Sequence, residues 1–455
     1  MNELSIERQK ENLYVKWVLL HLIGGGLIFL FPIVSKLYAI LIIVFGLRYI
    51  VINQNKNNEA LLMAAYITCA EVFLRMTHGN FLEQYAKYGV ILFLVIGMLY
   101  TSFSKKALPY WIFLFLLLPG VILSFFTLNF ETDIRKAITF NIIGSVTLFF
   151  SAIYCYNRKI NFERLLDVFK MGSLPLAATL VYMFLYTPSI KDVVTSTESN
   201  FETSGGYGPN QVSTILGLGM FLFYTLLIFA SKSKKMKFVI TILLLAITFR
   251  GIVTFSRGGI ITGIIMILIL TMITFLKVGS SGKMKIFNFI FIAIFTFSMV
   301  WLYSSVQTGG LIDKRYANQD ARGREKESKL TGRERLIESE FDMFFESPIW
   351  GMGVGKNKEY RLETTGIDAA SHNEISRLFA EHGMFGIAAL LILVFTPAFL
   401  YINNTQNLFV IGFIVFWALT INHAAMRLAA PAFIYALSLL KVSLYEESPV
   451  HREQT

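Results

Sequence analysis

An arginine stands between two apolar stretches of this chain with almost no loop around it. It is Arg257, in the tetrapeptide Ser256-Arg257-Gly258-Gly259. A guanidinium held this close to hydrocarbon is costly, and arginines at the edge of a membrane are functional candidates by default. The Ser256 hydroxyl and the glycine amides add hydrogen-bond donors, so the turn predicts an anion site suited to phosphate. The plainer alternative is that Arg257 reaches toward interfacial water.

Two polar residues near this turn could contribute to the same site. Arg250 lies about two helical turns before Arg257, so both side chains could face the same way. Asn210 follows the turn Gly208-Pro209, ahead of another apolar stretch. The plainer interpretation of Asn210 is a helix cap, and substrate binding is the alternative.

The long polar segment 305–375 carries further candidates. Arg333 and Arg335 open a stretch whose apolar residues recur at helical spacing, which predicts an amphipathic helix able to lie on the membrane interface. Pro348 ends this helix, and the glycine-spaced turn 350–355 follows. The residues that could share the apolar side are Leu336, Ile337, Phe341, Phe344 and Phe345. The start of the segment, around Arg322 to Lys329, is mixed in charge and is interpreted as a solvated arm.

A histidine marks the end of the long polar segment. His372 and Asn373 stand directly before the next apolar run. The unperturbed pKa of a histidine lies near neutrality, so His372 could act as a general base, with a purely structural role as the alternative. Glu381 lies about two helical turns into the apolar run and needs a cation there, for which Arg377 and Arg250 are the candidates.

The composition identifies the solvent in which these residues work. Hydrophobic residues make up 55% of the chain and charged residues 16%, whereas soluble domains run near a quarter charged. The runs are apolar on all sides, which favours helices over barrel strands. We therefore predict an all-α integral membrane protein with about 12–14 transmembrane helices and one large outer loop containing the amphipathic helix. The candidate spans are 17–35, 37–52, 60–75, 88–103, 107–126, 138–156, 166–187, 211–230, 238–256, 259–276, 286–304, 376–402, 408–422 and 428–444.

The positive residues of the short loops predict the orientation, because such residues stay on the cytoplasmic side. Both termini are then inside, and the turn at Arg257 and the segments 127–137, 188–210 and 305–375 face outward. The net charge of +11 is explained by anionic lipid at the inner leaflet and requires no nucleic acid. The expected organisation is N-terminal spans over 1–204, a catalytic region over 205–400, and C-terminal spans with a cytoplasmic tail over 401–455.

In combination, these segments resemble the O-antigen ligase and O-antigen polymerase superfamily of bacterial membrane glycosyltransferases. The resemblance covers 205–390, while the first half of the chain is similar only as a series of spans. It rests on Gly208-Pro209-Asn210, Ser256-Arg257-Gly258-Gly259, Gly332-Arg333, Pro348-Ile349-Trp350-Gly351-Met352-Gly353-Val354-Gly355, His372-Asn373, Glu381-His382-Gly383 and Gly386.

The resemblance implies an enzyme of the bacterial cytoplasmic (inner) membrane with its active site on the periplasmic or outer face. It would transfer a glycan from an undecaprenyl-diphosphate carrier to an acceptor sugar, inverting the anomeric centre, with no metal and no cofactor. Arg257, Arg333 and His372 match the family residues associated with activity. We expect substrate binding from Ser256, Arg250, Asn210, Asn373, Glu381 and Arg335.

The identity of the acceptor stays open. A polymerase would take a second lipid-linked repeat, a ligase lipid A-core, and a protein-glycosylating relative a hydroxyl side chain; we favour the polymerase slightly. Besides the bilayer, a chain-length regulator or a flippase could be a partner. The alternative from another class is a lipid-linked oligosaccharide flippase or another transporter. Such proteins often have repeated halves, whereas here the candidate chemistry is confined to 205–390, which favours an enzyme.

Overall fold

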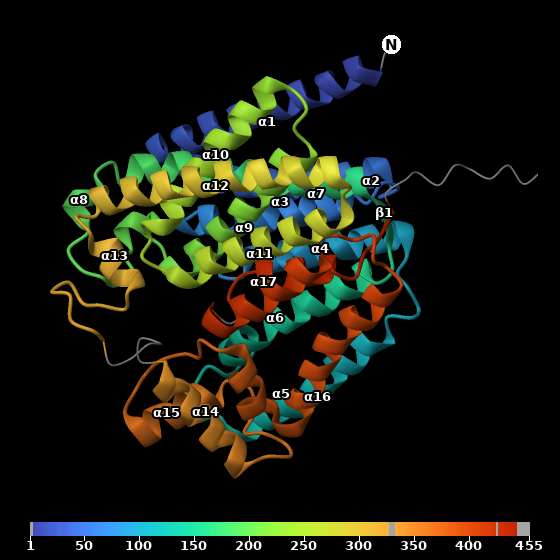
Figure 1. Cartoon of the computed structure of the whole chain (residues 1–455). Helices are drawn as coiled ribbons and strands as arrows, with labels where there is room; N and C mark the ends of the chain where they lie inside the picture. The colour runs from blue at the N-terminus through green and yellow to red at the C-terminus, as the bar shows by residue number, and fades with distance from the viewer. Residues whose placement is uncertain (1–2, 327–332, 425, 444–455) are drawn as a thin grey trace, which may run out of the picture.

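The computed structural model describes residues 3–326, 333–424 and 426–443, and these are mostly helical (Figure 1). Helices form because hydrocarbon offers backbone groups no hydrogen bonds, so each apolar run must satisfy its own. The helices are α1 (Glu3–Leu30), α2 (Ile33–Asn53), α3 (Glu59–Met76), α4 (Tyr85–Thr101), α5 (Leu108–Thr127), α6 (Ile134–Cys155), α7 (Phe162–Tyr186), α8 (Ile190–Val193), α9 (Pro209–Phe229), α10 (Lys234–Ile252), α11 (Arg257–Lys277), α12 (Ser280–Gln307), α13 (Leu311–Tyr316), α14 (Glu334–Glu346), α15 (Lys356–Thr365), α16 (Glu374–Ile402), α17 (Val410–Ala424) and α18 (Ala430–Leu437). A short 3-10 helix η1 (Glu202–Ser204) and the strands β1 (Lys159–Asn161) and β2 (Lys441–Ser443) complete the described structure.

The predicted all-α membrane architecture is confirmed. In the described part of the chain, nine helices have the length and apolar composition needed to cross a membrane, and α4 and α17 are shorter apolar helices. The predicted span 428–444 differs. Its helix, α18, has eight residues, which rise only about 12 Å. The chain then enters β2, which pairs in parallel with β1, so α18 is too short to span a bilayer.

Loops predicted to be cytoplasmic, among them those that carry Lys105, Arg158 and Lys277, meet at one end of the bundle, near β1 in Figure 1. The pairing of β1 with β2 joins the segment after α6 to the segment after α18. Arg158, just before β1, donates to the carbonyl of Ser102, which follows α4, at 2.6 Å. The Lys277 ammonium at the end of α11 donates to the carbonyl of Thr405. These contacts bring the segments after α4, α6 and α11, each with predicted cytoplasmic lysines or arginines, to one end of the bundle.

The four segments predicted to face outward meet at the opposite end. The amide of Asn129, from 127–137, donates to the carboxylate of Glu359 in α15 at 3.1 Å. Glu198, between α8 and η1, pairs with Lys326 of the long loop. The turn at Arg257 contacts α13, as described below. The candidate residues are thus gathered at the end of the bundle that lacks the basic loops.

The long loop is folded against the bundle at this end. The predicted amphipathic helix is confirmed as α14, which packs on α16 beside α15 (Figure 1). Its apolar residues do not share one environment: Leu336 is buried, whereas Phe345 is 73% exposed. The helix α15 was not predicted. In the predicted solvated arm, Arg324 is exposed and pairs with Asp320. Residues 327–332, which include the end of that arm and Gly332 of the Gly332-Arg333 motif, lie outside the described residues.

A kink in α16 holds the glycine-spaced turn of the loop. Gly383 has φ +58° inside the helix, so the carbonyls before it are released from the helical ladder. Ala380 accepts a hydrogen bond from the amide of Met352 at 2.9 Å, and Glu381 accepts one from the amide of Gly353 at 3.1 Å. A β-carbon at 383 would lie 2.7 Å from the backbone of Gly351, so only glycine fits this contact.

Gly383→Ala should therefore destabilise the protein by about 2 kcal/mol or more, because it adds backbone strain and forces two segments apart. Thermal unfolding of the purified protein in detergent would measure the change. Gly412→Ala in α17 is the matched control, since a β-carbon there meets nothing within 4 Å. Equal melting temperatures for Gly383→Ala and the wild type would contradict this account of the kink.

Candidate active site

The first predicted residue, Arg257, opens α11. Ser256 precedes the helix, but its hydroxyl donates to Asn210 Oδ1 at 2.8 Å and accepts from Ser213 at 2.9 Å. This pairing fastens α11 to the start of α9 and uses the hydroxyl that was expected to face an anion. The interpretation of Asn210 as a helix cap is wrong, because α9 begins at Pro209 with Gly208 as the capping position. Asn210 instead anchors the Arg257 turn through Ser256.

The Arg257 turn and α13 hold each other. Arg257 Nη1 donates to the carbonyl of Arg315 at 3.3 Å, and Arg315 Nε donates to the carbonyl of Phe255 at 2.9 Å. Phe255 has φ +59°, a conformation unfavourable for an aromatic residue, so it needs such support. A carboxylate oxygen of Glu198 lies 3.8 Å from Arg315 Nη1. These reciprocal contacts fix the direction of Arg257.

His423 of α17 connects the Arg257 turn with Arg333. A β-carbon at Gly258 would lie 2.8 Å from His423 Cδ2, so the imidazole lies directly against the residue after Arg257. Arg333, just before α14, donates from Nη1 to the carbonyl of His423 at 3.1 Å. The ring itself is held by Thr214 Oγ1, 3.1 Å from Nε2, and by the carbonyl of Leu419, 3.1 Å from Nδ1. The structure therefore brings Arg333 and the turn that carries Arg257 to the same histidine.

His372 lies beside the same group of cations. Arg427, which precedes α18, donates from Nη2 to the carbonyl of Ser371 at 2.7 Å. The Nδ1 atom of His372 is buried and has no hydrogen-bond partner among the described residues. Burial, and then the charges of Arg427 and Arg333, lower the pKa of His372 to about 4. The imidazole is thus neutral near pH 7 and available to take a proton.

The arginines at this end repel one another. Burial lowers the pKa of Arg333, and the charges of Arg427 and Arg257 lower it further. Burial and the charge of Arg257 likewise lower the pKa of Arg315. Within the described part of the chain, no carboxylate forms an ion pair with Arg333 or Arg427. Half-buried cations in mutual repulsion are stabilised when an anion binds between them, so this arrangement favours an anionic ligand.

Two predicted binding residues serve the scaffold elsewhere. Arg250 is fully buried and donates to the carbonyls of Thr187, at 3.4 Å, and Thr203, at 3.0 Å, so it supports the 188–210 segment. It does not lie with Arg257 or reach Glu381. Glu381 is also fully buried and pairs with Arg377, the other candidate partner.

Glu381 also supports the glycine-spaced turn, and the remaining two predicted binding residues, Asn373 and Arg335, contact neither the turn nor the arginine cluster in the described structure. Glu381 Oε1 accepts from the amide of Gly355 at 2.8 Å. Asn373 caps α16, where its side chain accepts from the amides of Ile375 and Ser376. Arg335 is exposed on α14. The structure thus gathers Arg257, Arg333 and His372, uses Arg250, Glu381 and Asn373 in supporting contacts, and leaves Arg335 exposed.

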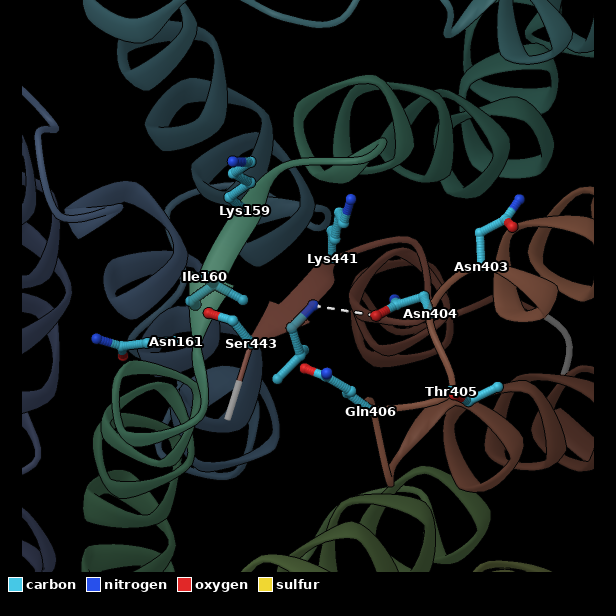
Figure 2. A pocket seen from close by; sticks show the side chains of 10 residues that line it. Lys159, Ile160, Asn161, Asn403, Asn404, Thr405, Gln406, Lys441 and Ser443 are labelled. Atoms are coloured by element: carbon cyan, nitrogen blue, oxygen red, sulfur yellow. Dashed lines mark hydrogen bonds between the residues drawn. The ribbon is translucent and has the colours of Figure 1, made fainter. Parts of the chain in front are cut away.

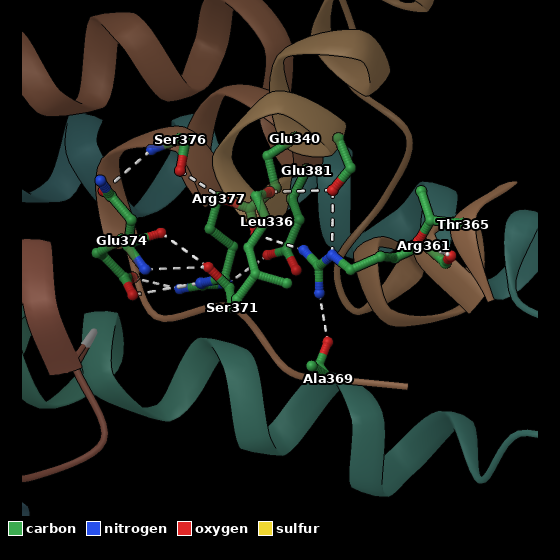
Figure 3. Close-up of polar contacts among 12 residues, drawn as sticks. Leu336, Glu340, Arg361, Thr365, Ala369, Ser371, Glu374, Ser376, Arg377 and Glu381 are labelled. Carbon is green, nitrogen blue, oxygen red and sulfur yellow. Dashed lines mark hydrogen bonds and ion pairs between the residues drawn. The ribbon is translucent and has the colours of Figure 1, made fainter. Parts of the chain in front are cut away.

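A buried charge network fastens the loop helices to α16, as Figure 3 shows. Arg361 of α15 pairs with Glu340 of α14 at 2.9 Å and donates to Ser339 at 3.0 Å, and both charged side chains are 1% exposed. The other carboxylate oxygen of Glu340 accepts from the Ser376 hydroxyl of α16. Arg377 adds an ion pair with Glu374 within α16. This network positions Arg333 at one end of α14 and His372 ahead of α16.

A cavity of about 650 Å³ lies at the opposite, basic end of the molecule (Figure 2). It is bordered by β1, β2 and the segment 403–406, and the amide of Val442 donates to Asn404 Oδ1 there at 3.3 Å. None of the residues predicted to act in chemistry lines it. We therefore place the candidate active site at the arginine cluster and not in this cavity.

Residues 240–392 match the family model described as O-antigen ligase. The chain carries a domain of the O-antigen ligase family. A comparison with curated proteins gave no match. The O-antigen ligase domain runs from within α10 into α16 and contains Arg257, Arg333 and His372, so the resemblance to the ligase and polymerase superfamily is confirmed. The domain indicates a multi-pass membrane enzyme that transfers glycosyl groups from a lipid-linked oligosaccharide to an acceptor.

Two residues at the site lie outside the matched O-antigen ligase domain and were not predicted. Arg427 stands between apolar residues, the same signal that drew attention to Arg257, and could have been found in that way. His423 is a single histidine at the end of an apolar run, and nothing in the sequence distinguishes it. Arg315, inside the domain, was missed because it lies in a segment already rich in charge.

The lowered pKa of His372 predicts an unusual pH profile. If neutral His372 is the base, kcat/KM should stay constant from about pH 8 to about pH 5 and fall only toward its pKa of about 4. Bound diphosphate favours the imidazolium, so kcat should begin to fall at a higher pH than kcat/KM. Initial rates across this range, on protein shown to stay folded, would measure both. A fall of kcat/KM near the ordinary histidine pKa of about 6.5 would contradict the assignment of His372 as the base.

Proposed function

We propose that this protein transfers a glycan from undecaprenyl diphosphate to the hydroxyl of an acceptor sugar, with inversion and without a metal ion. One observation carries the proposal: Arg333 and the turn that holds Arg257 both contact His423, and the charge of Arg333 also acts on His372, at the end of a membrane bundle that lacks the basic loops. Guanidinium groups bind phosphate oxygens through paired hydrogen bonds, so two of them suit a diphosphate.

The reaction requires one bond to form as another breaks. The acceptor oxygen attacks the anomeric carbon, and the bond from that carbon to the phosphate oxygen breaks on the opposite face, which inverts the centre. The diphosphate leaves with the bonding electrons, and Arg257 and Arg333 stabilise its growing negative charge. His372 takes the proton from the acceptor hydroxyl. Preorganised cations cost no rearrangement at this step, which is why the rigid contacts of the Arg257 turn matter.

The positive residues of the loops support an outer, periplasmic location for the site in the bacterial cytoplasmic membrane, because the site lies at the end opposite the basic loops. The enzyme would then meet lipid-linked glycans after their transfer across the bilayer. We propose a polymerase, which extends one lipid-linked repeat with another, in preference to a ligase. The acceptor would approach beneath α14 and α15, since Arg361 of α15 holds the carbonyl of Ala369, three residues before His372.

Reconstitution of the purified protein would test the proposal. It would be supplied with undecaprenyl-diphosphate oligosaccharide alone and together with lipid A-core, in the presence of a chelator. Chain extension with the carrier alone supports the polymerase, and transfer only to lipid A-core supports a ligase. Dependence of transfer on an added divalent cation would overturn the metal-independent mechanism. Movement of the lipid-linked glycan across vesicles, with no transfer to any acceptor supplied, would identify a flippase instead.

A further inference from the structure

The two ends of the arginine cluster face different surroundings. Arg257 begins α11, whose next residues include the exposed apolar side chains of Ile261 and Leu268, at 42% and 61%. The neighbouring span α12 has no buried residue in its most apolar window. Hydrocarbon therefore reaches the Arg257 end. His372 lies at the other end, where Arg361 of α15, paired with Glu340 of α14, donates to the carbonyl of Ala369 just ahead of it.

Arg427 lies at the polar end of the cluster. Its one described hydrogen bond, to the carbonyl of Ser371, leaves the other N–H groups of the guanidinium without an acceptor in the described structure. Its side chain is half-buried and forms no ion pair with any described residue. A guanidinium in this state retains its capacity for a bidentate contact with an anion. Arg427 also lies outside the matched O-antigen ligase domain, so the family match assigns it no role.

The contacts among these residues show the order in which their side chains follow one another. Gly258, which follows Arg257, lies against the ring of His423, and Arg333 donates to the His423 carbonyl. Arg427 donates to the carbonyl of Ser371, the residue before His372. Arg427 is also the charge that acts most strongly on both Arg333 and His372. The sequence of side chains from the lipid-facing end to the proton acceptor is thus Arg257, Arg333, Arg427 and His372.

We propose that the donor lies along this sequence, with its lipid-side phosphate at Arg257 and its sugar-side phosphate at Arg427. The proposal rests on the proposed function. The bond that breaks joins the sugar to the sugar-side phosphate, so Arg427 neutralises the oxygen on which charge first develops. The acceptor hydroxyl reaches the anomeric carbon from the side of His372. The polyprenyl chain leaves past the exposed faces of α11 and α12.

Two lipids separate the roles of the two ends. Undecaprenyl diphosphate has both phosphates, whereas undecaprenyl phosphate lacks the one that would contact Arg427. Binding of each would be measured with the full-length protein in nanodiscs, without any glycan. Arg427→Gln should weaken binding of the diphosphate by about tenfold or more, the effect of losing hydrogen bonds to a charged group, and leave binding of the monophosphate unchanged. Arg257→Gln should weaken binding of both lipids.

Controls keep the result interpretable. Arg135→Gln removes an exposed arginine at the same end of the molecule and should change neither affinity. Thermal unfolding would show whether each variant is folded. If Arg427→Gln does not fold, Arg427→Lys would take its place, because lysine keeps the charge but lacks the planar guanidinium. Unchanged diphosphate binding in a folded Arg427 variant, or equal weakening for both lipids, would overturn the proposal. If the wild type binds neither lipid more tightly than a neutral polyprenol, the proposed function itself fails.

Discussion

Arg257→Lys and Arg333→Lys should each lower glycan transfer by about 100-fold or more, although both keep the positive charge. A lysine ammonium is a single point donor, whereas the guanidinium offers paired N–H groups in a plane. Lysine at 257 also cannot reproduce both the contact with the Arg315 carbonyl and a bidentate contact with phosphate. Transfer from lipid-linked oligosaccharide by purified protein would measure the loss, with kcat affected more than KM if the contacts tighten in the transition state.

Arg135→Lys is the matched control for both substitutions, because this exposed arginine lies at the same end of the molecule outside the cluster. It should leave transfer at the wild-type rate. Membrane abundance and melting temperature would be compared for all three variants. Near-normal transfer by either Arg257→Lys or Arg333→Lys would remove that arginine from the proposed active site.

Arg361→Ala should destabilise the outer loop by about 3 to 5 kcal/mol, because it leaves the Glu340 carboxylate buried without its cation. The substitution also removes the hydrogen bond to Ser339 that joins α15 to α14. Because α14 carries Arg333, transfer should fall together with stability. Limited proteolysis between α13 and α16, at fixed temperature in detergent, would measure loop opening, and thermal unfolding would measure the whole protein.

An exposed pair in the same loop provides the comparison. Arg324 pairs with Asp320 at 2.7 Å, but its side chain is 71% exposed, and such pairs contribute only about 0–1 kcal/mol. Arg324→Ala should therefore leave the rate of proteolysis unchanged. Replacing Arg361 and Glu340 together by Met and Leu should recover much of the lost stability, since no unpaired charge remains. Equal proteolysis of Arg361→Ala and wild type would show that the buried pair does not hold the loop.

Much of the fold could be predicted because apolar runs of bilayer length must become helices. Local signals also identified α14, through its apolar spacing, and Arg257, because a guanidinium is expensive at a membrane edge. His372 was identified by its near-neutral unperturbed pKa and its place before an apolar run. The length of α18 could not be predicted in this way. Its apolar run continues beyond Leu437, but pairing with β1, far away in the chain, turns that end into a strand.

The sequence alone determined the class of protein, and it predicted Arg257 and His372 from local signals and Arg333 through the family resemblance. Only the tertiary structure decided which polar residues stand beside them. Ser256 and Asn210 are used in joining α9 to α11, and Arg333 reaches His423 across a separation of 90 residues. The physical reason is that spacing along one helix fixes which residues share a face, whereas contacts between distant helices depend on how their surfaces pack.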